Sequence, residues 1–170
     1  MSSTSDAGFD ITPSDPARAA PEEAHLASTA VSRVLVTAGL MVHQLDRILR
    51  RSSLTAGSFN VMQVIAASPV PLTPSEISVR IPVPVTTATM TGVLDTLERR
   101  GLVARLPHPT DRRRVLVELT QPGTDLLATL VPEVQAAERD WTGPLDADDL
   151  VALSCSLDAL QAGLRSIPRR

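Results

Sequence analysis

The sequence predicts a mainly α-helical protein that contains one small β-hairpin. Three observations carry this prediction. Apolar residues recur at steps of three or four along most of the chain, which is the period of an amphipathic helix. Two short runs of β-forming residues, 102–106 and 115–119, flank a polar turn. Threonines, prolines and a glycine stand where helix starts and stops are expected.

Composition limits the class of protein. The chain has 170 residues, of which 43% are hydrophobic, so it is able to bury a core. No run of about eighteen apolar residues occurs and the N-terminus is acidic, which predicts neither a membrane span nor an export signal. The single cysteine, Cys155, excludes an intramolecular disulfide and a cysteine-rich zinc module. We therefore expect a cytoplasmic protein.

The N-terminal third divides into a tail and a long helix. Residues 1–20 are rich in Ser, Asp, Ala and Pro and lack an apolar period, which predicts a disordered acidic tail. From Pro21 to about Arg51 an apolar stripe predicts one amphipathic helix, since proline and acids favour a first turn. Because this helix is long for so short a chain, residues 21–56 are interpreted as a dimerisation helix.

The middle of the chain predicts a helix-turn-helix followed by a hairpin. A helix over 58–67 precedes Thr73-Pro74-Ser75-Glu76, a capping box with proline at the first helical position. This opens a short helix that Pro82-Val83-Pro84 must end. The next helix begins at Thr86 or Thr87 and ends at Gly101, in a left-handed conformation. With the hairpin as a wing, residues 57–120 form a predicted winged helix-turn-helix DNA-binding region.

Two more helices are predicted in residues 121–170. Thr120 caps the first, which reaches about Trp141, and Asp146 opens the second. Leucines in the last helix alternate steps of three and four residues, as in a coiled-coil seam: Leu150, Leu153, Leu157, Leu160 and Leu164. We interpret both helices as a C-terminal dimerisation layer.

Charge is distributed unevenly. The net charge is −3, yet residues 80–114 hold seven arginines against three acids. All sixteen basic residues are arginine, whose planar fork suits phosphate and base edges, although GC-rich coding produces the same bias.

The predicted DNA contacts come from one helix and the wing. If Met90 and Leu94 face inward, helical geometry places Gly92 and Asp95 on the outer face. We expect the threonines near the helix start to bond phosphates or base edges. The alternative is that one threonine only caps the helix and another packs against the protein. In the wing, one arginine pairs with Asp111 while another enters the minor groove; the alternative is a solvated charge cluster. The predicted DNA-binding residues are Thr86, Thr87, Ala88, Thr91, Arg99, Arg112, Arg113 and Arg114, with Asp111 supporting the wing.

The chain resembles the MarR family of bacterial transcriptional regulators over about residues 24–167. The resemblance rests on LTPSEI (72–77), TATMTGVLDTLERRGLV (87–103), HPTDRRRVLVELTQPG (108–123) and VPEVQAAERDW (131–141). It implies a symmetric dimer on double-stranded DNA with a palindromic operator, a recognition helix in the major groove and a wing arginine in the minor groove.

The resemblance also implies a pocket between the dimer layer and the DNA-binding lobe. His43, Arg47, Phe59 and Trp141 are its candidate lining residues, for a small apolar or phenolic effector. Two features depart from the family. Gly92 stands where many relatives have arginine, and Pro82-Val83-Pro84 makes a turn about two residues longer than usual.

These observations predict a homodimeric repressor released by a small molecule. The alternative is a small-molecule-binding or protein-interaction module of the same fold that has lost specific DNA binding. No enzyme is expected, because His25, His43 and His108 are scattered and no phosphate loop, HExxH or nucleophile elbow occurs. No catalytic residue, cofactor or metal site is predicted, and Cys155 is interpreted as incidental.

Overall fold

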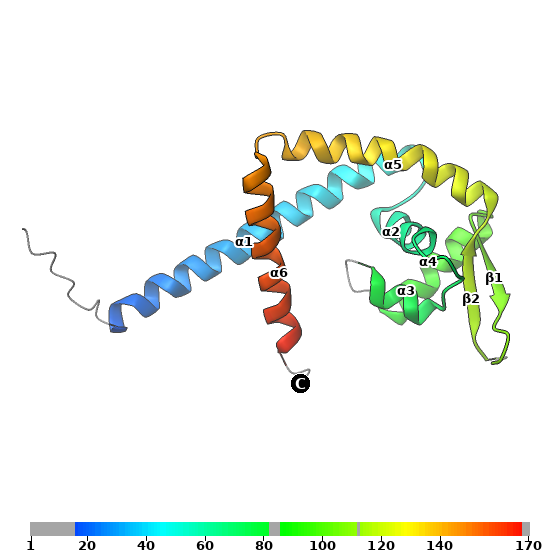
Figure 1. The fold of residues 1–170 in the computed structure, drawn as a ribbon, viewed down its shortest axis with the longest axis horizontal. Coiled ribbons are helices and arrows are strands. Elements are labelled where there is room, and N and C mark those ends of the chain that lie inside the picture. The colour runs from blue at the N-terminus through cyan, green and yellow to red at the C-terminus, as the bar shows by residue number, and fades with distance from the viewer. Residues whose placement is uncertain (1–15, 82–85, 112, 168–170) are drawn as a thin grey trace, which may run out of the picture. The chain divides into compact units, whose positions relative to one another are not determined.

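The computed structural model describes residues 16–81, 86–111 and 113–167 (Figure 1). Its elements confirm the mainly helical class with one antiparallel hairpin. In chain order they are α1 (Pro16–Leu49), the 3-10 turn η1 (Arg50–Ser52), α2 (Ala56–Ala66), α3 (Pro74–Arg80), α4 (Thr87–Arg99), β1 (Val103–Pro107), β2 (Val115–Leu119), α5 (Gln121–Thr142) and α6 (Ala147–Ser166). The chain divides into two units, 1–44 and 45–170.

Helix α1 begins earlier than the sequence pattern predicts. It starts at Pro16, so residues 16–20 are helical rather than part of a tail. The physical reason is that alanine and arginine, which fill this stretch, are strong helix formers and need no apolar period. Residues 1–15, the rest of the predicted tail, lie outside the described residues.

Most large apolar side chains of α1 are exposed. They include Leu26, Val31, Leu35, Val36, Leu40, Met41 and Val42. Among the described residues, the segment Glu22–Ser52 is long and apolar enough to cross a membrane by length and composition, although no run of purely apolar residues marked it. None of the apolar window is buried within this chain. Exposed apolar surface of this extent is typical of a surface that contacts another molecule.

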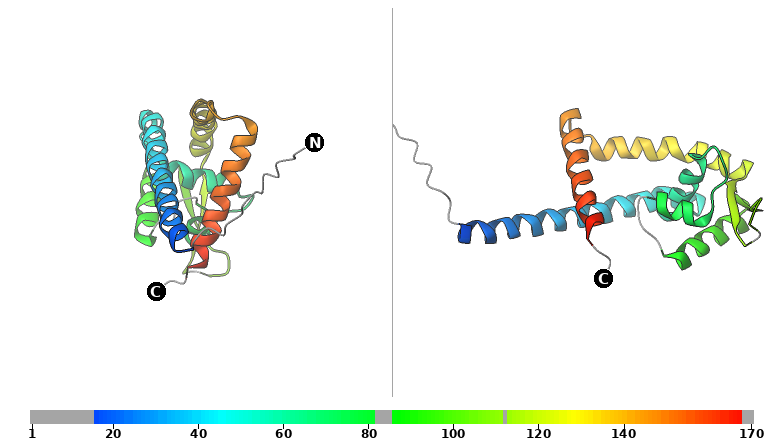
Figure 2. Two further views of the ribbon diagram at one scale, coloured as in Figure 1. Left: turned by 90° about the vertical axis from the view of Figure 1, so that its left-hand side faces the viewer. Right: turned by 60° about the horizontal axis from the view of Figure 1, so that its bottom comes forward.

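The hydrophobic core lies in the second unit. Helices α2, α3 and α4, the hairpin and α5 contribute to it, and its most deeply buried side chains are Leu49, Phe59, Met62, Ile77, Leu94, Leu97 and Val117. Figure 2 gives two further views of the hairpin beside these helices. This core holds the helix-turn-helix and the wing together as one packed group.

Threonine caps start successive helices. Thr55 accepts a hydrogen bond from the Ser58 backbone N–H, and Thr86 accepts one from Thr89. At α3 both halves of the predicted capping box are present between Thr73 and Glu76. These caps satisfy backbone donors that the first helical turn leaves unpaired.

The hairpin is joined to the helix-turn-helix by a short third strand contact. In the hairpin Val103 pairs with Leu119 and Pro107 with Val115. Leu72, just before α3, exchanges backbone hydrogen bonds with Val117 of β2, with N···O distances of 3.1 and 2.7 Å. The start of α3 is therefore tied directly to the wing.

Helix α5 begins on the backbone that leads into β1. The Thr120 hydroxyl donates to the Gly101 carbonyl at 2.6 Å, and the Thr120 N–H donates to the Leu102 carbonyl at 3.1 Å. Gly101 has the predicted left-handed conformation, with φ +67°. A Cβ on Gly123 would lie 2.0 Å from the Leu102 carbonyl oxygen, so only glycine fits there.

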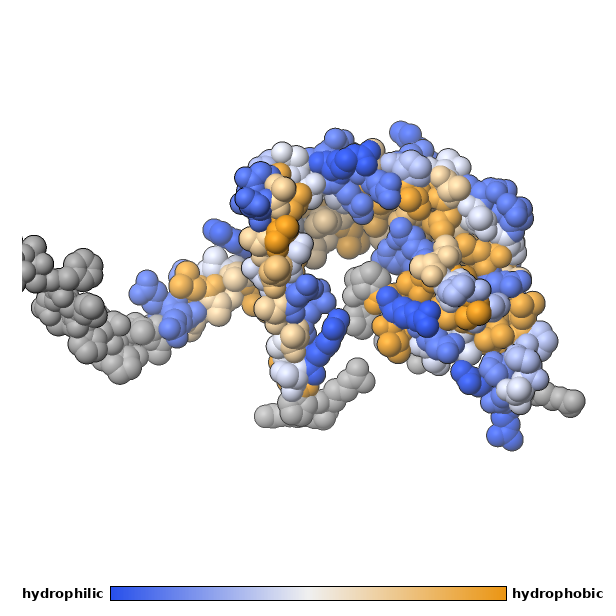
Figure 3. All heavy atoms as spheres, viewed as in Figure 1, coloured by the Kyte–Doolittle hydropathy of each residue, from blue (hydrophilic) through white to orange (hydrophobic). Residues whose placement is uncertain are grey.

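Helix α6 starts with a capping box between Asp146 and Asp149. Its predicted leucine seam is open to solvent at Leu153, Leu160 and Leu164, which are 46%, 38% and 61% exposed. Figure 3 shows apolar residues on the surface of α1 and α6. Cys155 is also exposed.

Candidate nucleic-acid interface

Helix α4 presents a polar face beside an apolar one. Met90, Leu94 and Leu97 are buried, as predicted, whereas Ala88 and Thr91 are exposed. Nothing lies within 4 Å of where a Cβ on Gly92 would stand, so this face has room for a ligand or a larger side chain. The described residues of this face are therefore exposed to solvent.

The hydroxyl groups at the start of α4 are engaged in capping. Besides accepting from the Thr89 N–H at 3.1 Å, the Thr86 hydroxyl lies 2.9 Å from that of Thr89. Thr87 is the first helical residue, but its side chain lies outside the described residues, as does the turn at Pro82-Val83-Pro84. Of the threonines proposed for DNA contact, Thr86 thus acts first as a cap.

In the described part of the wing, Arg113 and Arg114 are exposed. The Asp111 carboxylate accepts a hydrogen bond from the Arg113 backbone N–H at 3.0 Å, and the Asp111 carbonyl accepts from the Arg114 N–H. The contact described for Asp111 therefore supports the wing through the backbone, and the predicted pairing with an arginine side chain stays a prediction. Arg112 lies outside the described residues.

Arg105 in β1 joins the hairpin to α4. Its guanidinium lies 2.6 Å from the Asp95 carboxylate and 3.1 Å from that of Glu98. Asp95 and Glu98 are one turn apart on the helix, so one arginine neutralises both. The sequence analysis did not predict this cluster. A usable signal was present, because two acids three residues apart on a helix precede an arginine in the next strand.

Arginines at the end of α4 have different roles. Arg99 donates a hydrogen bond to the Thr96 hydroxyl at 3.2 Å, and its side chain is exposed to solvent. Arg100 donates to the carbonyls of Ser52 and Ser53 at 2.6 and 2.7 Å. Arg100 thereby satisfies carbonyls at the end of η1 and anchors α4 to the segment that follows α1.

The Glu76 carboxylate forms part of the capping box at the start of α3. Hydrogen bonds from the hydroxyl and the backbone N–H of Thr73, at 2.6 and 2.7 Å, hold the pKa of Glu76 below its usual 4.5. The charges of Arg114 and Arg80 lower this pKa further. Each of these interactions favours the ionised carboxylate.

Replacing Glu76 with glutamine is expected to lower the free energy of unfolding at neutral pH. Because the folded-state pKa is depressed, the stabilisation is complete above 4.5 and is lost as the pH falls through the lower folded value. Urea unfolding of both proteins at successive pH values below 4.5 measures this effect. The free energies of unfolding of the two proteins should become equal as the pH falls. Glu133→Gln on α5 serves as the control, and a difference that persists at low pH would contradict the capping role.

Of the four predicted pocket residues, His43 belongs to the first unit, and Arg47, Phe59 and Trp141 belong to the second. Phe59 is 1% exposed and packs in the core, because α2 turns it toward the other core helices. Arg47 lines a hollow of about 660 Å³ that also contains Arg51, Glu133 and Asp140, whereas Trp141 is half-buried and His43 is exposed. Among the described residues, no group of three or more His, Cys, Asp and Glu side chains is placed to hold a metal ion.

Comparison with known proteins identifies the family. The MarR family model matches residues 54–115, which contain the helix-turn-helix and most of the wing. The regulator HosA of Escherichia coli O111:H- is 33% identical over 100 residues, a match that covers 56% of this chain and 69% of HosA. This chain belongs to the MarR family.

Two further relatives bear on what a MarR-family protein of this kind does. The transcriptional repressor NicR of Pseudomonas putida is 39% identical over 66 residues, a match that spans 42% of NicR and 39% of this chain. The structure of a MarR variant from E. coli in complex with operator DNA has a TM-score of 0.69 and 28% identity. It covers 77% of this chain and 93% of that MarR chain.

Proposed function

We propose that this MarR-family chain is a cytoplasmic transcriptional repressor that binds a two-fold symmetric operator as a homodimer. The observation that carries the proposal is the pairing of an accessible α4 face with an arginine-bearing wing in one packed unit. The relatives support it, since NicR is named a repressor and the MarR variant was crystallised with operator DNA.

In the proposed complex α4 enters the major groove and the wing lies over the adjacent minor groove. Ala88 and Thr91 face base edges and methyl groups, while the helix start faces phosphates. Arg113 or Arg114 enters the minor groove, where the negative potential favours a guanidinium group. Arg105 keeps the acids of α4 neutralised where they approach the DNA.

The homodimer accounts for the uncovered apolar stripes. A second copy of the chain is able to cover the exposed leucines and valines of α1 and α6, and a two-fold pair would present two recognition helices about 34 Å apart. A membrane is the weaker explanation for α1, because Arg33 lies in the middle of the apolar stretch and its burial in lipid would be costly.

Arg113→Ala is expected to weaken operator binding about tenfold and to flatten its salt dependence, because one phosphate-neutralising charge is lost. The measurement is a mobility shift at two salt concentrations with duplex DNA from the region upstream of the chain's own coding sequence. Arg139→Ala removes an exposed arginine from α5 and should bind like the parent protein.

Failure of the parent protein to retain this duplex in a salt-sensitive manner would favour the other candidate, a ligand-binding or interaction module without specific DNA binding. Unchanged binding by Arg113→Ala would instead show that the wing is wrongly assigned.

A further inference from the structure

The segment that joins the end of α1 to the start of α2, residues 46–56, is called the elbow and lies in the second unit. Contacts hold it at both ends. The Asp46 carboxylate accepts a hydrogen bond from the Ala56 backbone N–H at 2.6 Å. The Leu54 N–H donates to the Leu49 carbonyl at 3.2 Å, and both leucines are buried in the core. The two ends of the elbow are therefore fixed to the same core as the helix-turn-helix.

The turn of the elbow has a backbone conformation that needs support. Ser53 has φ +50° and ψ +38° and is the one non-glycine residue with positive φ in the described ranges of the chain. Residues other than glycine keep this left-handed conformation only where the surrounding structure imposes it. The Ser53 N–H donates to the Arg50 carbonyl at 3.0 Å, which is one such constraint. The other comes from α4.

Arg100, at the end of α4, supplies the second constraint. Its two terminal nitrogens lie 2.6 and 2.7 Å from the carbonyl oxygens of Ser52 and Ser53. A planar guanidinium that donates from both nitrogens at once accepts a narrow range of directions. Arg100 and Ser53 are exposed, so water replaces these hydrogen bonds at little cost when they are lost. The contact therefore contributes more to the direction of α4 than to stability.

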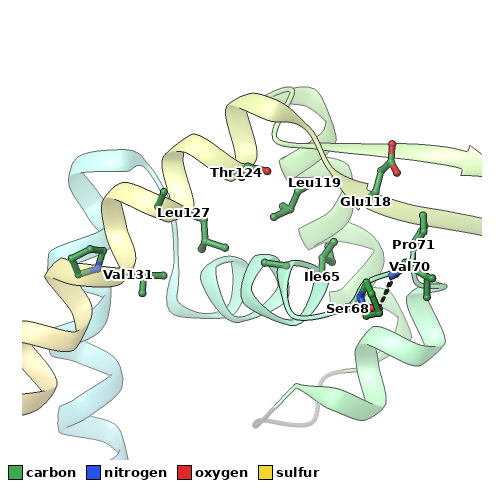
Figure 4. Close-up of a pocket in the computed structure, with 13 residues that line it drawn as sticks. Ile65, Ser68, Val70, Pro71, Glu118, Leu119, Thr124, Leu127 and Val131 are labelled. Carbon is green, nitrogen blue, oxygen red and sulfur yellow. Dashed lines mark hydrogen bonds between the residues drawn. The ribbon is translucent and has the colours of Figure 1, made fainter.

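The other connection between the elbow and α4 passes through α2, which borders a hollow of about 570 Å³ (Figure 4). In Figure 4 Leu127 on α5 and Leu119 on β2 point toward the helix that carries Ile65. Side chains beside an open space lack packing partners on one side, which lets a helix shift there. The Arg100 contact bypasses α2, because it joins α4 to the elbow directly.

We propose that Arg100 is a positioning residue for operator binding, which fixes the direction of α4 and thereby the half-site spacing that the homodimer accepts. The inference rests on the proposed binding of a two-fold operator. Met90, Leu94 and Leu97 are buried and keep α4 on the core without Arg100, so loss of the contact frees only the end of the helix. Because each copy presents one α4, a change in its direction acts twice on the operator.

The test measures how strictly the full chain requires one operator spacing. The probes are the duplex from the region upstream of the chain's own coding sequence and two derivatives, with one base pair inserted at or removed from its two-fold centre. Each change moves a half-site by about 3.4 Å and turns it by about 35°. In mobility-shift titrations the parent protein should bind both derivatives at least about thirtyfold more weakly than the original duplex.

Arg100→Met keeps a long side chain but removes every hydrogen-bond donor. This variant should reduce the ratio between the original and the altered duplexes at least about fivefold, because a less constrained α4 reaches a displaced half-site at lower cost. Circular dichroism should show the helix content of the parent protein. A merely stabilising contact would leave the preference for one spacing unchanged.

Arg99→Met is the matched control. It removes the same charge from the neighbouring residue, whose described hydrogen bond goes to Thr96 on its own helix. Arg99→Met should weaken binding to all three duplexes alike and leave the ratio between them at the parent value. The control thus separates the loss of a positive charge from the loss of the contact with the elbow.

A folded Arg100→Met protein that discriminates among the three duplexes as the parent does would overturn the inference and leave the repressor function standing. An equal loss of discrimination in Arg99→Met would also overturn it, since the effect would then follow charge. So would an unfolded Arg100→Met, because the contact would then be needed for stability. A parent protein that retains none of the duplexes would overturn the proposed function and, with it, this inference.

Discussion

Replacing Gly123 with alanine is expected to lower the free energy of unfolding by at least about 3 kcal/mol. The new Cβ would lie 2.0 Å from the Leu102 carbonyl oxygen, well inside van der Waals contact. That carbonyl is not free to move, because it accepts the Thr120 N–H and the neighbouring Gly101 carbonyl accepts the Thr120 hydroxyl. Relief of the clash therefore means breaking the cap that starts α5. Urea denaturation followed by circular dichroism measures the effect.

Gly92→Ala provides the matched control for this prediction. Gly92 is also helical, but nothing lies within 4 Å of its Cβ position. Alanine there should raise the free energy of unfolding by about 0.5–1 kcal/mol, because glycine loses more backbone entropy on folding. Equal stability of Gly123→Ala and the parent protein would mean that α5 is not seated on Leu102 as described.

Replacing Arg105 with methionine is expected to reduce operator affinity about thirtyfold, which is about 2 kcal/mol. The substitution removes a cation and leaves two carboxylates unpaired on the helix proposed to enter the major groove. Stability should fall by less than about 1 kcal/mol, since the side chains of Asp95 and Glu98 are 49% and 40% exposed and the ion pairs are screened by water. Operator titrations and urea unfolding of the same variant separate the two effects.

A second substitution distinguishes charge repulsion from a general loss of structure. Asp95→Asn in the Arg105→Met background removes one of the exposed negative charges and should recover part of the lost affinity. If the double variant bound no better than Arg105→Met, repulsion by Asp95 would not be the cause.

Much of the fold could be predicted because its signals are local. The capping box at Thr73 and Glu76, the left-handed Gly101 and the apolar faces of α4 and α5 each depend on residues within a few positions of one another. The wing at 108–114 was predicted for the same reason, because a turn that contains proline and aspartate can be recognised from its own residues. The start of α1 was placed too late because alanine-rich helix carries no apolar period.

The remaining features of the site depend on residues that the chain brings together from a distance. Arg105 contacts acids seven and ten positions away, and Arg100 reaches the carbonyls of Ser52 and Ser53. The hollow beside Ile65 needs walls from α2, β2 and α5. The sequence by itself determined the order of the elements, their caps and the arginine-bearing wing, because propensity, capping and periodicity act over a few residues. Only the tertiary structure decided which arginines are anchors and which are accessible, and that Phe59 belongs to the core, because side-chain pairing across elements is fixed by how those elements pack.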